Sequence, residues 1–201
     1  PELRTTFGGE QEQQQESFGS LGTNFLLALL VIYALLAIPF GSYIQPVIIM
    51  AAIPFGIIGA VVGHLLLGLP VGLLSLFGII GLSGVVVNDS LVMIDFVNEN
   101  RRNGLGIRES VIDAAKSRFR PIMLTSLTTF LGVAPITFER SLQAQFLIPM
   151  AAALAFGILF ATVILMLVVP ALATVQMEVE EWLQGGSTPA EPVPQAVVAG
   201  D

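Results

Sequence analysis

The sequence contains no cysteine among its 201 residues, and it has only one histidine and one tryptophan. Without thiols, disulfide bridges, zinc–thiolate sites and cysteine nucleophiles are excluded. Charged residues make up 11% of the chain, whereas soluble domains carry about 25%. Hydrophobic residues make up 54%. Because so few polar side chains cannot cover a globule, we expect lipid to surround much of the chain.

Five apolar runs dominate the sequence and are separated by short polar connections. Each is close to or above the roughly 20 residues that a helix needs to cross a hydrocarbon core about 30 Å thick. Runs with almost no charge have no polar face, which argues against buried helices of a large soluble protein. We therefore predict an all-α membrane protein with a bundle of five transmembrane helices. The expected bundle covers residues 21–175, with spans at 21–39, 46–69, 71–98, 121–138 and 146–175.

Three polar stretches flank or connect these spans. Residues 1–20 are rich in Gln, Glu and Gly, and we expect a linker there. In the connection 99–120, apolar residues recur every four positions, which predicts an amphipathic helix over about 105–119 on the membrane surface. Residues 176–201 end in a Pro-, Gly- and Ala-rich stretch, so we expect a largely disordered tail. Since the chain starts at Pro1, we expect it to belong to a longer polypeptide.

The basic residues are unevenly distributed, and their distribution predicts an orientation. Most of the Lys and Arg residues lie in the connection 99–120. The positive-inside rule places this connection in the cytoplasm. With five spans, the N-terminal segment is then outside and the C-terminal tail inside. The formal net charge of −7 does not suggest a nucleic-acid partner, because nucleic-acid-binding proteins present basic surfaces.

The third run carries Asn88 and Asp89 well inside its apolar sequence. A charged Asp at the centre of a membrane helix costs about 2.5–3.5 kcal/mol, so such a group usually faces other helices or a water path. We expect one polar face of this helix to look at the rest of the bundle. That face consists of Gly78, Gly81, Gly84, Asn88, Asp89 and Asp95. Two interpretations stay open: a proton or ion relay, and a structural hydrogen-bonding cluster that fixes helix packing.

The fourth run begins with Pro121, which suits the first turn of a helix. Its hydroxyl-bearing face consists of Thr125, Thr128, Thr129 and Gly132. We expect Thr125 to bond across to the polar face of the third run, although threonine hydroxyls also bond carbonyls of their own helix. Arg118 and Arg120 precede the run, and they either pair with acidic groups or anchor the helix at the inner membrane face.

The second run contains Gly59 and Gly63 in the spacing GxxxG, a signal for close helix packing. Glycine lacks a Cβ atom, so two helices can approach closely at these positions. His64, the single histidine, lies near the outer end of the same run, where we expect it to form hydrogen bonds at the membrane interface.

An enzymatic alternative comes from residues 81–84, which read Gly-Leu-Ser-Gly, the GxSG pattern of rhomboid-type intramembrane serine proteases. Such an enzyme needs a histidine within hydrogen-bond distance of Ser83. Ser83 lies roughly 18 Å into its span at 1.5 Å per residue, whereas His64 is near the outer interface. We therefore disfavour the protease and expect no enzyme activity.

Four stretches of the sequence are specific when they are taken together. They are FGSYIQPVIIMAAIPFGIIGAVVGHLLLGLP (40–70), GLSGVVVNDSLVMIDFVN (81–98), RFRPIMLTSLTTFLGVAPITFERSLQAQFLIPM (118–150) and VVPAL (168–172). In order and spacing they resemble the C-terminal transmembrane half of the resistance-nodulation-division superfamily, hydrophobe/amphiphile efflux branch. The resemblance implies that the five spans correspond to the last five of twelve helices. Residues 1–20 would then end a periplasmic region.

The resemblance also implies a function. Members of this branch are secondary active transporters that use proton antiport to export hydrophobic and amphiphilic compounds, as in acriflavin and other multidrug resistance. They work as homotrimers in the bacterial inner membrane, with a periplasmic adaptor and an outer-membrane channel. Membrane lipid, protons and small hydrophobic substrates are thus the expected partners, and we expect no cofactor and no metal site. The alternative within the superfamily is a module that serves protein translocation or lipid handling.

Drug pumps of this family couple protons through an acidic pair on an earlier helix, a Lys on the helix that matches the third span, and a Thr and an Arg on the next. The resemblance places Thr125 at that Thr and Arg118 at that Arg. Asn88 stands at the Lys position and cannot supply its charge. The resemblance therefore implies a differently built network, in which Asp89 titrates.

Overall fold

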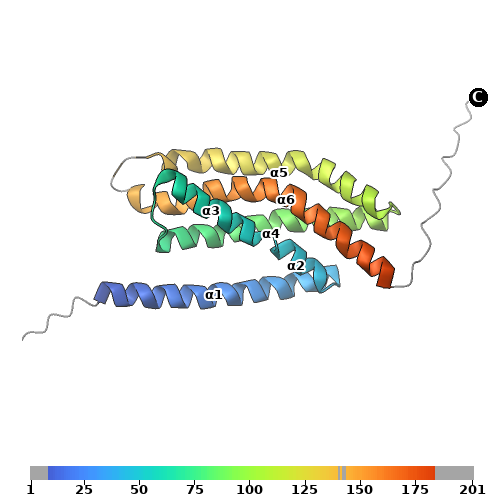
Figure 1. Cartoon of the computed structure of the whole chain (residues 1–201), viewed down its shortest axis with the longest axis horizontal. Helices are drawn as coiled ribbons and strands as arrows, with labels where there is room; N and C mark the ends of the chain where they lie inside the picture. The colour runs from blue at the N-terminus through green and yellow to red at the C-terminus, as the bar shows by residue number, and fades with distance from the viewer. Residues whose placement is uncertain (1–8, 140, 142–143, 184–201) are drawn as a thin grey trace, which may run out of the picture.

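The computed structural model describes residues 9–139, 141 and 144–183, and in these residues it contains helices but no strand. The elements are α1 (Gly9–Phe40), α2 (Ile44–Met50), α3 (Ile53–Leu67), α4 (Leu73–Arg102), α5 (Ile107–Thr137), the short 3-10 helix η1 (Ala144–Phe146) and α6 (Ile148–Leu183). Five segments are long and apolar enough to cross a membrane, with α2 and α3 forming one of them. The predicted all-α membrane architecture with five spans is confirmed (Figure 1).

Two helices extend beyond the predicted spans. α1 already begins at Gly9, within the expected linker 1–20, and α6 continues to Leu183. Both extensions are rich in Gln and Glu, which are good helix formers. The expected disordered tail is therefore wrong for residues 176–183, which are helical, while residues 184–201 lie outside the described residues.

The second predicted span is interrupted close to its first turns. α2 ends at Met50 and α3 begins at Ile53, where the sequence predicted one helix over 46–69. Pro54 accounts for the break, because its nitrogen has no hydrogen for the carbonyl one turn earlier and its ring crowds that carbonyl. At the start of α3 the missing N–H has no cost. The two helices still cross the membrane as one segment, Ile44–Leu67.

α5 joins two elements that the sequence separated. The predicted surface helix 105–119 and the predicted span 121–138 form one continuous helix, with Pro121 inside it. Membrane helices tolerate an internal proline because hydroxyl side chains and neighbouring helices satisfy the freed backbone groups. The expectation that Pro121 starts a helix is therefore wrong.

α6 lies at the centre of the bundle and contacts α3, α4 and α5 (Figure 1). Its contact with α3 depends on the GxxxG glycines. An added Cβ at Gly59 would come within 2.4 Å of the Phe160 Cβ, and one at Gly63 within 2.4 Å of the Phe156 Cβ. Since real Cβ atoms do not approach this closely, only glycine fits at these two positions.

The contact between α4 and α6 uses one of the three α4 glycines that the sequence placed on the inward face, and it adds a glycine of α6. An added Cβ at Gly78 would lie 2.6 Å from the Met150 carbonyl oxygen. At Gly81 the nearest such contact is an ordinary 3.7 Å, and at Gly84 nothing lies within 4 Å. On α6, Gly157 admits the side chain of Leu82. Close packing therefore involves Gly78 and Gly157, whereas Gly81 and Gly84 do not take part among the described residues.

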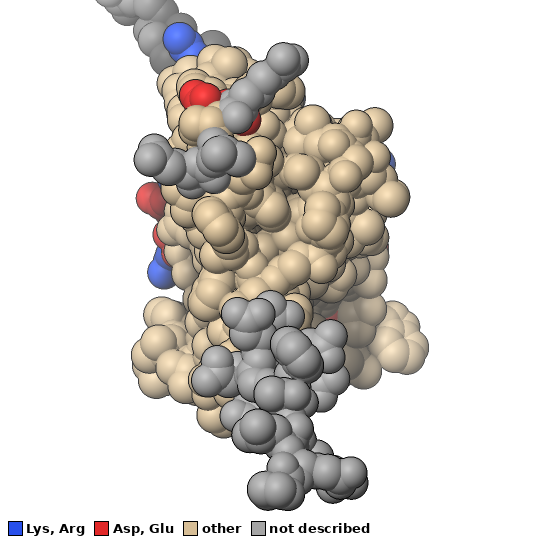
Figure 2. Space-filling view, turned by 90° about the vertical axis from the view of Figure 1, so that its left-hand side faces the viewer, with Lys and Arg blue, Asp and Glu red and all other residues tan. Residues whose placement is uncertain are grey.

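α1 lies at the side of the bundle and meets the other helices mainly through α2 (Figure 1). Between α1 and α2 is an open, apolar cleft of about 440 Å³. Its lining residues are Leu29, Leu30, Tyr33, Val47, Met50 and Ala51. Figure 2 looks onto the end of the bundle at which α1 begins and shows mostly uncharged surface with a few charged side chains.

The opposite end, where α4 meets α5, is held together by polar contacts; we call it the basic end, after Arg101, Arg102 and Arg108. Arg101 forms an ion pair with Glu181 near the end of α6, at 2.8 Å. Gln45 of α2 and Asn98 of α4 exchange two amide hydrogen bonds, of 3.1 and 2.9 Å. These contacts connect α2, α4 and α6 at one end.

Candidate functional site

The predicted polar face of α4 is divided between the bundle and the surface. Asp89 is buried, with 7% of its area exposed, whereas the neighbouring Asn88 is exposed. Successive residues of a helix are rotated by about 100°, so Asp89 lies roughly 20° from Gly78, and Asn88 roughly 80° from it on the other side. Gly78 and Asp89 thus form the buried edge of the face. Its exposed members are Gly81, Gly84, Asn88 and Asp95.

Asp89 is the buried acidic residue of the described chain. Neither a hydrogen bond nor an ion pair joins its carboxylate to any residue within the described ranges. The adjacent Ser90 hydroxyl is occupied, because it donates to the Val86 carbonyl at 2.8 Å. Asp89 therefore retains a full capacity to bind a proton, a cation or a hydrogen-bond donor.

Thr125 does not bond across to α4. Its side chain is exposed, and its hydroxyl donates to the Pro121 carbonyl of its own helix. Thr128 and Thr129 do the same, donating to carbonyls of α5. The prediction of a contact between helices is wrong here, because a local carbonyl one turn away is always within reach of a threonine hydroxyl.

The hydroxyl contact between helices is made one residue later. Ser126 of α5 and Thr162 of α6 are both buried, and their oxygens lie 2.6 Å apart. The sequence alone did not indicate this pair. The signal that could have found it is the spacing of Ser126 from Ile122 and of Thr162 from Ile158 and Leu165, which places both hydroxyls on the apolar, inward stripes of their helices.

Arg118 does not pair with an acidic group. Its guanidinium lies over the ring of Phe96 on α4, with 4.5 Å between the guanidinium carbon and the ring centroid. Such a cation–π contact stabilises a partly desolvated arginine. Its Nε is buried and has no hydrogen-bond partner among the described residues. Of the two interpretations of the sequence, pairing with an acidic group is not found among the described residues, and anchoring at the inner membrane face stays a prediction. Arg118 instead joins α5 to α4 through Phe96, and one donor of its side chain remains available.

The hydrogen bonds of His64 and Ser83 do not fit a protease. His64 is 2% exposed; its Nδ1 donates to the Ala60 carbonyl at 2.8 Å, and its Nε2 accepts from the Ser75 hydroxyl at 2.8 Å. Ser83 instead donates to the Ile79 carbonyl. His64 is therefore a buried link between α3 and α4, where the sequence predicted hydrogen bonding at the membrane interface. No group of three or more His, Asp or Glu residues that could hold a metal ion occurs in the described part of the chain.

Comparison with known sequences agrees with this architecture. The model of the AcrB/AcrD/AcrF family matches residues 1–175. The multidrug resistance protein MdtC of Pantoea ananatis (strain AJ13355) is 30% identical over 169 residues, which cover 84% of this chain and 16% of MdtC. The swarming motility protein SwrC of Bacillus subtilis (strain 168) is 35% identical over 129 residues, which cover 64% of this chain and 12% of SwrC.

A solved structure shows the same fold. The crystal structure of a heavy metal efflux pump (crystal form II) matches with a TM-score of 0.77 and 27% identity, over 89% of this chain and 18% of that chain. The chain therefore spans less than a fifth of the length of each of these relatives. Since the family model covers most of the sequence and the five-helix fold agrees, the chain belongs to the AcrB/AcrD/AcrF family of resistance-nodulation-division efflux transporters.

Proposed function

We propose that the chain forms part of a proton-antiport efflux pump in which Asp89 binds and releases the transported protons. One observation carries the proposal: Asp89 is 7% exposed among membrane helices, and no described residue compensates its charge. A charged carboxylate costs about 2.5–3.5 kcal/mol at the centre of a membrane helix. Protonation, or a cationic partner, removes this cost. A group in this position can therefore make the arrangement of the helices depend on a proton gradient.

The exposed residues of α4 and α5 complete the proposal. Asn88 and Thr125 both lie on the surface of the described bundle. Because the chain spans only 12–18% of the length of its relatives, we propose that this surface faces the remainder of a longer pump. The cation that Asn88 cannot supply then comes from Arg118, whose Nε is buried and free of a described partner, or from that remainder.

The substrates that we propose are small hydrophobic and amphiphilic compounds, since several relatives are named as multidrug resistance proteins. We further propose a homotrimer in the bacterial inner membrane that joins a periplasmic adaptor and an outer-membrane channel. The basic end faces the cytoplasm, in accordance with the positive-inside rule. This chain has no cysteine, so Asn103→Cys gives it one label site, and any cysteines in the rest of the pump are replaced first. If an impermeant maleimide added from the periplasmic side labels this cysteine, the proposed orientation is wrong.

The test of Asp89 is Asp89→Asn in the intact pump, reconstituted into vesicles with a pH gradient. We expect loss of dye export and of the accompanying proton flux, while the oligomer stays folded. Glu99→Gln on the same helix is the matched control, because Glu99 is exposed near the basic end, and it should retain export. Undiminished export by Asp89→Asn would remove Asp89 from coupling and leave it a structural role.

A further inference from the structure

The Ser126–Thr162 pair has a defined direction of hydrogen bonding. Thr162 donates its single hydroxyl hydrogen to the Ile158 carbonyl, at 2.7 Å. The hydrogen in the 2.6 Å contact between the two hydroxyls must therefore come from Ser126. The Ser126 oxygen is then left with a lone pair and no hydrogen to give. Ser126 is buried, with 1% of its area exposed, so water does not readily reach this lone pair. The Ser126 oxygen can therefore only accept a further hydrogen bond.

The helix contacts place Asp89 at the level of this pair. On α4 and α6, Gly78 lies against Met150 and Ala153. About three turns further along both helices are Asp89 and Thr162. On α4 and α5, which run in opposite directions, Phe96 lies against Arg118, and about two turns from that contact are Asp89 and Ser126.

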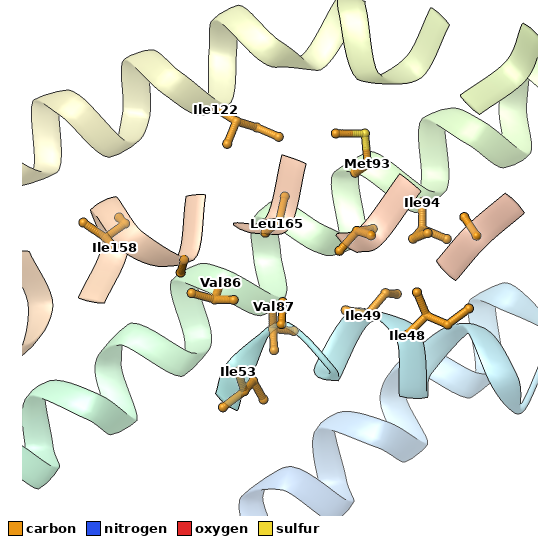
Figure 3. Packing of buried hydrophobic residues seen from close by; sticks show 14 of the residues in the cluster. Ile48, Ile49, Ile53, Val86, Val87, Met93, Ile94, Ile122, Ile158 and Leu165 are labelled. Atoms are coloured by element: carbon orange, nitrogen blue, oxygen red, sulfur yellow. The ribbon is translucent and has the colours of Figure 1, made fainter. Parts of the chain in front are cut away.

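Asp89 also lies on the side of α4 that faces α5. Asp89 and Phe96 are two turns apart, so they lie on one stripe of α4, and Phe96 contacts α5. Figure 3 shows the adjoining apolar layer, in which Met93, Ile122 and Leu165 approach one another from α4, α5 and α6. These residues lie one turn from Asp89, Ser126 and Thr162. The three helices therefore bring one carboxyl group and two hydroxyls into a single layer.

We propose that the Ser126–Thr162 hydroxyl pair accepts a hydrogen bond from protonated Asp89 and thereby joins α4 to α5 and α6 in the proton-loaded state. A protonated carboxyl donates to Ser126, Ser126 to Thr162, and Thr162 to the Ile158 carbonyl. An ionised carboxylate can only accept, so it finds no donor in this chain of hydrogen bonds. Ionised Asp89 binds Ser126 only if Thr162 gives up the Ile158 carbonyl. The only covalent change is the gain or loss of the carboxyl O–H bond.

Few other charged or titratable groups face this layer. From α5 it is Arg118, two turns toward the basic end. From α3 the titratable residue is His64, but it is bonded to Ala60 and Ser75, and Ser75 lies about four turns of α4 away from Asp89. α2 and the spanning part of α6 contribute no Asp, Glu, Lys, Arg or His. Protonation of Asp89 is therefore the change in charge to which the hydroxyl pair responds.

This inference rests on the proposed role of Asp89, and its test uses the intact, reconstituted pump. The carboxyl C=O stretch of Asp89 is measured by infrared difference spectroscopy and assigned by its absence in Asp89→Asn. We expect Ser126→Ala to raise its wavenumber, because the carboxyl proton loses its acceptor. The pH profile of export should shift to lower pH by about 0.5–1 unit, which corresponds to the roughly three- to tenfold effect of one hydrogen bond between membrane helices.

The controls separate this role from a general packing effect. Thr162→Ser keeps the hydroxyl and should keep the profile, whereas Thr162→Val should shift it as Ser126→Ala does. Ser83→Ala removes an equally buried hydroxyl that bonds only its own helix, and it should leave both readouts unchanged.

Three results would overturn the inference. One is a C=O stretch at the position of a carboxyl without hydrogen bonds in the unsubstituted protein, which decides the matter even if Ser126→Ala does not fold. Another is an unshifted profile in Ser126→Ala. The third is a profile that moves with Thr125→Val alone, which would identify Thr125 as the acceptor. If Asp89→Asn exports normally, the proposed function fails instead, before the hydroxyl pair is considered.

Discussion

α1 and α6 are both long and apolar, yet they differ in how they meet the other helices. In the most apolar 18-residue stretch of α1 only 6% of the residues are buried, compared with 50% in the corresponding stretch of α6. The difference lies in residue size. α6 buries a series of small residues, Ala151, Ala152, Ala153, Ala155, Gly157 and Ala161, whereas α1 exposes Leu, Val and Ile along its length.

The comparison of α1 with α6 shows that an apolar sequence is enough for a helix to enter the membrane, whereas small residues are needed for it to pack closely against other helices. In water a leucine gains by leaving the solvent, whereas in a bilayer the lipid chains are as apolar as leucine itself. What remains is close contact between helices, which needs positions without large side chains. α3 and α4 provide such positions in Gly59, Gly63 and Gly78, opposite α6.

The largest expected effect comes from filling one of these positions. We expect Gly63→Leu to lower the free energy of unfolding in detergent by about 3 kcal/mol, since its Cβ alone would lie 2.4 Å from the Phe156 Cβ. Gly22→Leu on α1 is the matched control, because nothing lies within 4 Å of an added Cβ there. It should be neutral or stabilising by up to about 1 kcal/mol. Equal losses would mean that α1 is packed as closely as α6.

A smaller effect is expected from creating a cavity. Leu165 of α6 is 1% exposed and Leu35 of α1 is 63% exposed. Leu165→Ala should cost about 2 kcal/mol of unfolding free energy, at the low end of values for soluble cores, because lipid removes part of the transfer term. Leu35→Ala should change it by less than about 0.5 kcal/mol. Thermal unfolding in one detergent measures both, and a loss at Leu35 that matches Leu165 would contradict the comparison.

The sequence predicts the five spans because length and composition are local properties. It also singles out Gly63, since GxxxG has a fixed spacing on one helix face. It does not separate Asn88 from Asp89, because a rotation of about 100° decides which of the two is buried, and neighbouring helices set that rotation. Ser126 and Thr125 differ in the same way. Their partners follow from the register between helices, which no single helix encodes.

The smallest expected effect concerns the connection between α1 and the bundle. α1 is attached chiefly through α2, and α2 is joined to α4 by the amide pair of Gln45 and Asn98. A double-mutant cycle with Gln45→Ala and Asn98→Ala should give a coupling energy of about 0.6 kcal/mol, the mean for hydrogen bonds between membrane helices, and no more than about 1.7 kcal/mol, their maximum. Asn24→Ala on α1 removes an exposed amide and should change stability by less than about 0.5 kcal/mol.

The sign and size of this coupling decide how independent α1 is. Gln45 is 8% exposed, so each single variant leaves its partner amide in a largely apolar environment, and the single losses should exceed the coupling energy. A coupling energy near zero would mean that the pair does not hold α2 on α4. The attachment of α2, and of α1 through it, would then depend on the buried apolar side chains of Ile48 and Ile49.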